Sequence, residues 1–296
     1  MKQVYLDNAA TTMIDSGVVK AMLPYMTLSY GNPSSPHDLG REAQEAIKRA
    51  RKIIASRINA KPEEIVFTGS ATEADNLAIK GIAHANKSKG RHIITSTIEH
   101  KAILESCRAL ESEGFSITYL DANEDGIVNP LDIKKAIRKD TILVSIMHAN
   151  NEIGTIQDIA AIGKICKAAG IYFHTDAAQS FTKIPIDVQV MGIDAITLSA
   201  HKIHGPKGIG ALYVRQGTKM QPLIHGGSQE AAMRAGTEHV ANIVGFAAAA
   251  NATSQADIRK MAMLRNYFTR ELLKLPKVTL NGSKVNRLCN NINVTF

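Results

Sequence analysis

Short apolar runs rich in β-branched residues alternate along this chain with longer segments of helical period. Runs that are apolar at nearly every position are typical of strands covered on both faces, and strands separated by helix-length segments are typical of βαβ units. The pattern therefore predicts an α/β fold, a mostly parallel sheet flanked by helices. Only a loop separates the last two runs, which predicts a local departure from strict alternation. The predicted strands are residues 64–67, 92–96, 116–120, 142–147, 171–174, 195–198 and 211–214, and the helices between the earlier ones include 43–58, 72–86, 102–113 and 156–169.

The pattern changes after about residue 250. Residues 256–274 predict one amphipathic helix, and the short apolar runs 278–280 and 291–296 predict strands around a polar turn. We expect a large domain over residues 13–255 and a small α+β domain built from residues 1–12 and 256–296. Because the sequence stops inside an apolar run, the small domain is expected to be incomplete at its C-terminus. A fragment is the simplest interpretation, and a natural split protein is the alternative.

Composition excludes several classes of protein. The chain has 296 residues, of which 45% are hydrophobic and 21% charged, and a net charge of +8 that is spread along helices rather than clustered, which does not favour nucleic-acid binding. Cys107, Cys166 and Cys289 are far apart, which argues against a disulfide framework or a metal site, fits a reducing compartment and suggests three structural cysteines. No secretory segment and no run of about 18 apolar residues is present, so we expect a cytoplasmic protein without membrane contact.

Lys202 is the most informative residue for chemistry. It follows the predicted strand 195–198 directly and precedes a Gly/Pro loop, HGPKG at residues 204–208. Burial at a strand end lowers the pKa of a lysine and frees its amine to form a Schiff base, as pyridoxal phosphate chemistry requires. The alternative is a solvated lysine in a surface loop.

The segment Ser70 to Glu73 opens a helix directly after a strand. It fits a capping box, with Ser70 as the N-cap and Glu73 reaching back. It also fits an anion site, because backbone N–H groups and the Thr72 hydroxyl converge where the helix dipole favours a phosphate. Ordinary dinucleotide and P-loop motifs are absent from the sequence.

Three further strand ends carry polar side chains that could face a ligand. His100 could stack on an aromatic cofactor and move protons, or it could be a structural histidine. Asn151, in an Asn-rich turn, could donate to a cofactor oxygen or a substrate carboxylate. Asp176 could pair with a protonated pyridine nitrogen, with Gln179 near the ring hydroxyl, or it could simply be a helix N-cap.

A long polar loop follows at residues 226–237. Loops of this length inside a compact domain are usually functional or mobile. Arg234 and Thr237 could supply phosphate contacts, including contacts to a neighbouring subunit. Each of these signals is modest alone, but their order gives a phosphate cradle, a counter-charge for a ring and a Schiff-base lysine at the ends of one sheet.

With these residues in view, the chain resembles the cysteine desulfurases. They are the class V aminotransferase-like branch of the fold-type-I pyridoxal phosphate (PLP) enzymes, and they supply sulfur for iron–sulfur clusters. The resemblance is carried by YLDNAATT at residues 5–12, YGNPSS at 30–35 and NVTF at 293–296, and it covers essentially the whole chain.

The resemblance implies a role for each candidate residue. Lys202 would hold PLP covalently, and His100 would stack on the ring and act as acid and base. Asp176 would pair with the pyridine nitrogen, Gln179 with the ring oxygen, and Asn151 would lie near the cofactor and the substrate carboxylate. The phosphate would be held by Ala71, Thr72, Ser199 and His201, joined by Thr237 from the partner subunit of a homodimer.

The implied reaction removes sulfur from L-cysteine and gives alanine and a protein persulfide, which passes to a sulfur-acceptor or scaffold protein. The family's loop cysteine and its carboxylate-binding arginine would lie beyond Phe296. We therefore expect this chain to bind PLP but to turn over cysteine poorly or not at all. The alternatives are a selenocysteine lyase-like or other class V PLP enzyme, and a catalytically silent scaffold for sulfur-acceptor proteins.

Overall fold

The computed structural model describes residues 4–296, and its centre is a seven-stranded sheet of order β1-β7-β6-β5-β4-β2-β3. β7 runs antiparallel to both of its neighbours, β1 and β6, while the pairs β2–β3, β2–β4, β4–β5 and β5–β6 are parallel. The predicted α/β fold with a mostly parallel sheet is confirmed, and β7 is the expected departure from alternation. The strands are β1 (Ile65–Thr68), β2 (His92–Ser96), β3 (Ser116–Leu120), β4 (Thr141–Ser145), β5 (Tyr172–Asp176), β6 (Ala195–Ser199) and β7 (Gly210–Val214).

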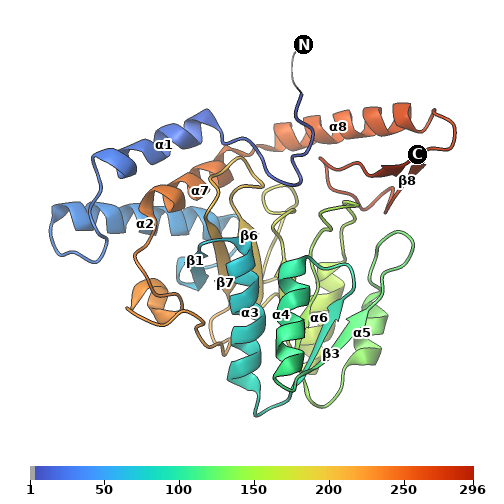
Figure 1. Cartoon of the computed structure of the whole chain (residues 1–296), viewed down its shortest axis with the longest axis horizontal. Coiled ribbons are helices and arrows are strands. Elements are labelled where there is room, and N and C mark those ends of the chain that lie inside the picture. The colour runs from blue at the N-terminus through green and yellow to red at the C-terminus, as the bar shows by residue number, and fades with distance from the viewer. Residues whose placement is uncertain (1–3) are drawn as a thin grey trace.

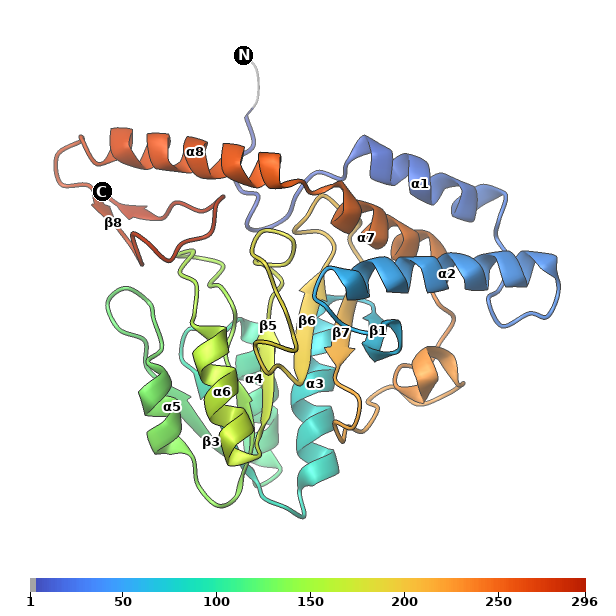
Figure 2. The same ribbon diagram turned by 180° about the vertical axis from the view of Figure 1, so that it is seen from behind.

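Helices cover both faces of this sheet (Figures 1 and 2). One face carries α3 (Ala71–Asn86) and α4 (Lys101–Ser112). The other carries α2 (Asp38–Ser56), α5 (Pro130–Ala136), α6 (Ile159–Ala169) and α7 (Val240–Ala252), and α1 (Ser16–Thr27) packs on α7.

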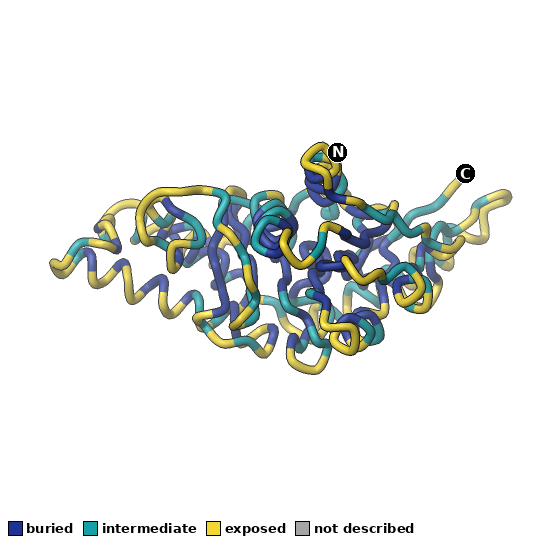
Figure 3. Tube along the Cα trace, turned by 90° about the horizontal axis from the view of Figure 1, so that it is seen from below, coloured by how far each residue is buried: buried dark blue, intermediate teal, exposed yellow. Residues whose placement is uncertain are grey.

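Successive residues of a strand belong to two separate hydrophobic cores, one on each side of the sheet. Phe67, for example, belongs to the core shared with α2, α6 and α7, whereas its neighbour Val66 belongs to the core shared with α3 and α4. This follows from the two-residue repeat of a strand, and it explains why both positions have to be apolar. Figure 3 shows the buried parts of the trace gathered along the middle of the molecule.

The C-terminal stretch forms α8 (Gln255–Leu272) and a two-stranded antiparallel sheet of β8 (Thr279–Leu280) and β9 (Val294–Thr295). It lies beside the N-terminal segment (Figures 1 and 2), and Leu6 and Asn8 share a cavity with α8. Residues 1–3 of the expected small domain are outside the described residues. Within residues 4–296, no helix has both the length and the apolar character needed to span a bilayer.

The long loop expected at residues 226–237 contains a short 3-10 turn, η2 (Gln229–Ala232). Three successive non-glycine residues in it, Glu230, Ala231 and Ala232, have positive φ angles of 47°, 54° and 61°. The buried Glu230 carboxylate accepts from Arg51 of α2 at 2.6 and 2.7 Å and from the Phe67 N–H of β1 at 2.8 Å. These contacts attach an unfavourable turn to the sheet.

Candidate active site

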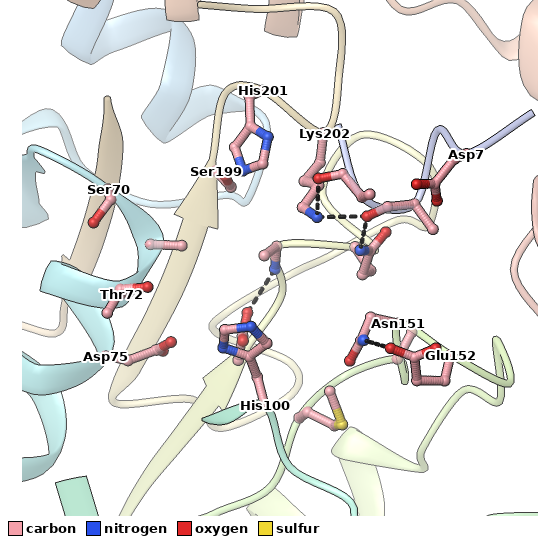
Figure 4. Close-up of a pocket in the computed structure, with 18 residues that line it drawn as sticks. Asp7, Ser70, Thr72, Asp75, His100, Asn151, Glu152, Ser199, His201 and Lys202 are labelled. Atoms are coloured by element: carbon pink, nitrogen blue, oxygen red, sulfur yellow. Dashed lines mark hydrogen bonds between the residues drawn. The ribbon is translucent and has the colours of Figure 1, made fainter. Parts of the chain in front are cut away.

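The carboxyl ends of the parallel strands meet at one edge of the sheet, and a cavity of about 450 Å³ opens there. Nine of the ten predicted site residues line it, brought from five strand ends far apart in the sequence. Figure 4 shows Ser70 and Thr72 at the start of α3 on one side, Lys202 on the other, and His100 projecting from below. The nine are Ala71, Thr72, His100, Asn151, Asp176, Gln179, Ser199, His201 and Lys202.

Lys202 lies in the hairpin loop between β6 and β7. Its Nζ donates to the backbone carbonyls of Ala9 and Ala10, the second at 2.8 Å. Burial lowers the pKa of this amine, and the carboxylates of Asp176, Asp7 and Glu152 oppose the shift. Peptide oxygens therefore hold the amine in a half-buried position, and burial there leaves it uncharged more readily than a surface lysine.

Asp176 ends β5, where it is 6% exposed. Its Oδ1 accepts from the Ala178 N–H at 2.8 Å within a turn, and because no helix begins here the N-cap alternative is wrong; the side chain lines the cavity. Burial raises the pKa of Asp176, while the Ala178 N–H, His100 and Lys202 lower it. A buried carboxylate facing a cavity calls for a cationic group in that cavity.

The N-terminus of α3 and the end of β6 form a second polar corner of the cavity. Ser70 caps α3 by accepting from the Glu73 N–H at 3.1 Å. A Cβ at Gly210 would lie 2.6 Å from the Ser70 carbonyl carbon, so only glycine lets β7 pass this close to the helix start. The buried Ser199 hydroxyl lines the cavity and has no hydrogen-bond partner among the described residues. A phosphate would satisfy both this hydroxyl and the free N–H groups of the helix start.

His100 and His201 enter the cavity with different surroundings. His100 is the N-cap of α4, and its Nδ1 accepts from the Ala102 N–H at 3.2 Å, which leaves Nε2 free to exchange a proton. His201 Nδ1 contacts the Thr11 hydroxyl at 3.1 Å. Burial, followed by the charges of Lys202 and Lys207, lowers the pKa of His201 to about 4, so this imidazole is neutral at pH 7.

Two expectations about the polar segments need correction. The Glu73 carboxylate accepts from the Gly69 N–H at 2.9 Å rather than from that of Ser70, because it is drawn toward Arg234 at 2.8 Å. Arg234 is thus occupied by Glu73 and is not a lining residue of the Lys202 cavity. Thr237 is exposed and lies at two other hollows, outside the cavity of its own chain.

The cavity also contains residues that the strand-end argument missed. Asp7, Ala9 and Ala10 come from the N-terminal segment, Glu152 follows Asn151, and Asp75 comes from inside α3. Residues 5–12 were singled out only because they resemble the cysteine desulfurase pattern, since they do not follow a predicted strand. Asn151 itself donates to the Glu152 carboxylate at 2.7 Å.

No cysteine side chain is among the described residues that line this cavity. Cys107 and Cys166 are fully buried in α4 and α6, and burial raises the pKa of each thiol to about 12. Cys289 lines a neighbouring cavity of about 560 Å³ that shares Lys202. Residues 4–296 contain no group of three or more His, Cys, Asp or Glu side chains arranged to hold a metal ion.

Comparison with known proteins identifies the family. The aminotransferase class-V family matches residues 4–296. The chain belongs to this family. Among curated class-V relatives, the cysteine desulfurase IscS of Dictyoglomus turgidum is 54% identical, with 100% of this chain and 76% of the relative covered. The cysteine desulfurase IscS of Methanosarcina thermophila is 53% identical, with 100% and 74% covered.

Solved structures of similar proteins share this fold. A "NifS-like protein" superposes with a TM-score of 0.96 at 38% identity, covering 100% of this chain and 82% of the other. "SspA in complex with cysteine" gives a TM-score of 0.92 at 44% identity, covering 99% and 84%. The fold is therefore that of the fold-type-I PLP transferases, and the chain spans about three quarters of the length of these curated relatives.

Proposed function

We propose that this chain is a PLP-dependent cysteine desulfurase, which takes sulfur from L-cysteine and leaves alanine. The observation that carries the proposal is the pairing of a half-buried lysine amine with a buried carboxylate in one cavity, Lys202 and Asp176. The relatives named as cysteine desulfurases, and the similar structure solved with cysteine, support L-cysteine as the substrate.

The residues of the cavity fit PLP. Lys202 would hold it through the amine, and Asp176 would meet the ring nitrogen. Ser199, Thr72, His201 and the N–H group of Ala71 would hold the phosphate. When bound, PLP supplies an electron sink for the electron pair released at the substrate Cα.

Two side chains, Lys202 and His100, would transfer protons. The Lys202 amine is available as a base because its burial favours the uncharged form, whereas His100 offers its free Nε2 toward the cavity. Gln179 would contact the ring oxygen; here its Nε2 donates to the Ala9 carbonyl at 2.8 Å. Asn151, beside Glu152 at the other wall, would sit near the substrate carboxylate.

The cysteine sulfur passes to an acceptor thiol, so one C–S bond is replaced by one S–S bond and alanine is released.

We also propose a cytoplasmic homodimer that passes sulfur to an acceptor or scaffold protein in iron–sulfur cluster assembly. Exposed apolar side chains around α1, among them Met13, Leu23 and Met26, support a subunit contact. Thr237, exposed and outside the cavity of its own chain, would serve the phosphate of the partner subunit. Residues 13–255 would form the cofactor domain, with residues 1–12 and 256–296 in the smaller one.

Reconstitution with PLP tests the proposal. The wild-type chain and Lys207→Ala, a matched exposed lysine in the same loop, should both show the yellow band of lysine-bound PLP, and Lys202→Ala should lose it. Single-turnover alanine release is then measured with L-cysteine or selenocysteine and an added small thiol. Because no cysteine thiol is among the residues that line the described cavity, we expect little alanine without the added thiol and slow release with it. Thiol-dependent alanine from L-cysteine supports the proposal. A band without any cysteine-dependent alanine would indicate a silent PLP-binding scaffold, and release from selenocysteine alone would indicate a lyase.

A further inference from the structure

The turn that carries Asn151 along the cavity wall is held from outside by two asparagines of the C-terminal stretch. The Nδ2 atom of Asn291 donates to the backbone carbonyl of Glu152 at 3.0 Å and to that of Asn151 at 3.5 Å. The Nδ2 atom of Asn293 donates to the same Glu152 carbonyl at 3.2 Å. Neither asparagine lines the cavity itself, and none of the roles above uses them.

Asn291 is fixed on both sides of its amide. It is 7% exposed, and its Oδ1 accepts from Nη1 of Arg287 at 3.2 Å, which leaves Nδ2 facing the turn. A Cβ at Gly154 would lie 2.4 Å from this Oδ1, so the turn packs directly against the amide. Beside it, the Leu288 N–H donates to the Gly154 carbonyl at 2.9 Å. A buried amide whose donor and acceptor are both used keeps one orientation, so it can hold the turn in one place.

On its inner side the turn presents polar side chains to the cavity, and Figure 4 shows Asn151 and Glu152 together at one wall. Asn150 sets the shape of the turn, because its Oδ1 accepts from the Glu152 N–H at 2.9 Å and from the Ile153 N–H at 3.0 Å. The Asn151 amide has two N–H groups, and the Glu152 carboxylate accepts one of them at 2.7 Å. The other N–H is left to donate to a ligand, and its position depends on where the turn is held.

We propose that Asn291 is a positioning residue for the substrate: it holds the Asn151 turn so that the Asn151 amide meets the carboxylate of the amino acid. This inference rests on the proposed function, in which Asn151 lies near that carboxylate. Asn291 acts through Asn151 and takes no part in bond breaking. Recognition of the carboxylate thereby depends on the C-terminal stretch as well as on the strand ends of the large sheet.

Two ligands that differ only in the carboxylate separate this role from a general structural one. L-Alanine and ethylamine are titrated into the PLP-loaded chain, and the absorption change of PLP gives a dissociation constant for each. The ratio of the two constants is compared among wild type, Asn291→Ala, Asn151→Ala and the double variant. Asn286→Ala is the matched control, because this exposed asparagine meets the turn through its backbone carbonyl, which accepts from the Ile156 N–H at 2.8 Å.

We expect Asn151→Ala to weaken L-alanine about tenfold or more, as when a hydrogen bond to a charged group is lost. Asn291→Ala should weaken it by less, about three- to tenfold, because Asn150 still anchors the start of the turn to the Ile98 carbonyl at 2.9 Å. Ethylamine, and both ligands in Asn286→Ala, should stay within about twofold of wild type.

The double variant decides whether Asn291 acts through Asn151. Once Asn151 is alanine, the contact that Asn291 positions is gone, so adding Asn291→Ala should leave the ratio unchanged. An equal loss in both backgrounds, an equal loss for both ligands, or no loss at all would show that the proposal is wrong.

Amide hydrogen exchange in the PLP-free chain gives a readout that does not depend on the cofactor. Residues 151–154 should exchange faster in Asn291→Ala than in wild type or Asn286→Ala, and unchanged exchange would contradict the anchoring. If Asn291→Ala does not fold, Asn291→Asp takes its place, because Asp keeps the acceptor for Arg287 and removes only the donor; the double-variant comparison then decides in the same way. If wild type responds to neither ligand, the proposed function is wrong and the role of Asn291 falls with it.

Discussion

The ion pair between Arg51 and Glu230 gives the clearest prediction about stability. It joins α2 to the η2 turn with two contacts of 2.6 and 2.7 Å, and the two side chains are only 18% and 2% exposed. Replacing Glu230 by Ala leaves the guanidinium and the Phe67 N–H without their buried acceptor. Removing one partner of a buried pair costs about 3–5 kcal/mol. Arg51 keeps its contact to the Ile65 carbonyl and lies 4.8 Å from the Phe67 ring centre, so we expect the lower value, about 3 kcal/mol.

Thermal unfolding of the variant measures this loss. A chain of 296 residues has an unfolding entropy of about 0.6 kcal/mol per kelvin, so Glu230→Ala should lower the Tm by about 5 °C. Glu271→Ala is the control, because this carboxylate forms pairs with Arg270 near the end of α8 and with Lys274 just after it, and solvent screens such surface pairs so that their loss should leave the Tm nearly unchanged.

The backbone of the same turn supplies an independent check. Ala231 has a φ of 54°, which costs an L-residue about 1–2 kcal/mol and glycine little. After the greater chain entropy of glycine is subtracted, Ala231→Gly should raise stability by about 0.5–1 kcal/mol. Equal Tm values for Glu230→Ala and Glu271→Ala, or a loss of stability in Ala231→Gly, would refute the view that Glu230 holds a strained turn.

Two further changes test the packing of α6 and a buried histidine. A Cβ at Gly163 would lie 1.9 Å from the Met191 carbonyl oxygen, so Gly163→Ala should cost about 1–3 kcal/mol in denaturant unfolding, whereas Lys164→Ala on the exposed side of the helix should be nearly neutral. Burial lowers the pKa of His148 from 6.5 to about 4, so between these values the unfolded chain binds a proton that the folded chain does not. This side chain should therefore cost stability as the pH falls through that window, by about 1.4 kcal/mol per pH unit, and His148→Gln should flatten the Tm profile from pH 7 to 5; an unchanged slope would contradict the burial argument.

The sheet could be predicted from the sequence because its strands are buried on both sides. All seven strands lie within two residues of their predicted positions, since double burial leaves an apolar run that few other structures produce. The helices α1, α5 and α7 were not predicted, and α5 has only 7 residues, too few to show a helical repeat. α7 is rich in alanine and buried along most of its length, so it lacks the polar face that marks an amphipathic helix, and α1 contains Pro24.

The cavity was predictable to the extent that it is built from strand ends. Side chains that follow parallel strands meet at one edge, which is why nine predicted residues line the same space. Asp75 could not be found in this way, because its direction depends on how α3 docks on the sheet. Ala9 and Ala10 were missed for another reason: they act through backbone oxygens, which carry no signal in the identity of the side chain.

The carbonyl contacts of Lys202 have an evolutionary consequence. Since every residue type carries the same peptide oxygen, point substitutions at Ala9 or Ala10 alter bulk near the amine without deleting its acceptors. Insertions or deletions in this stretch, by contrast, would shift the oxygens out of reach. Lineages descending from such a protein should therefore tolerate varied small residues at these two sites while keeping the spacing to the first helix fixed.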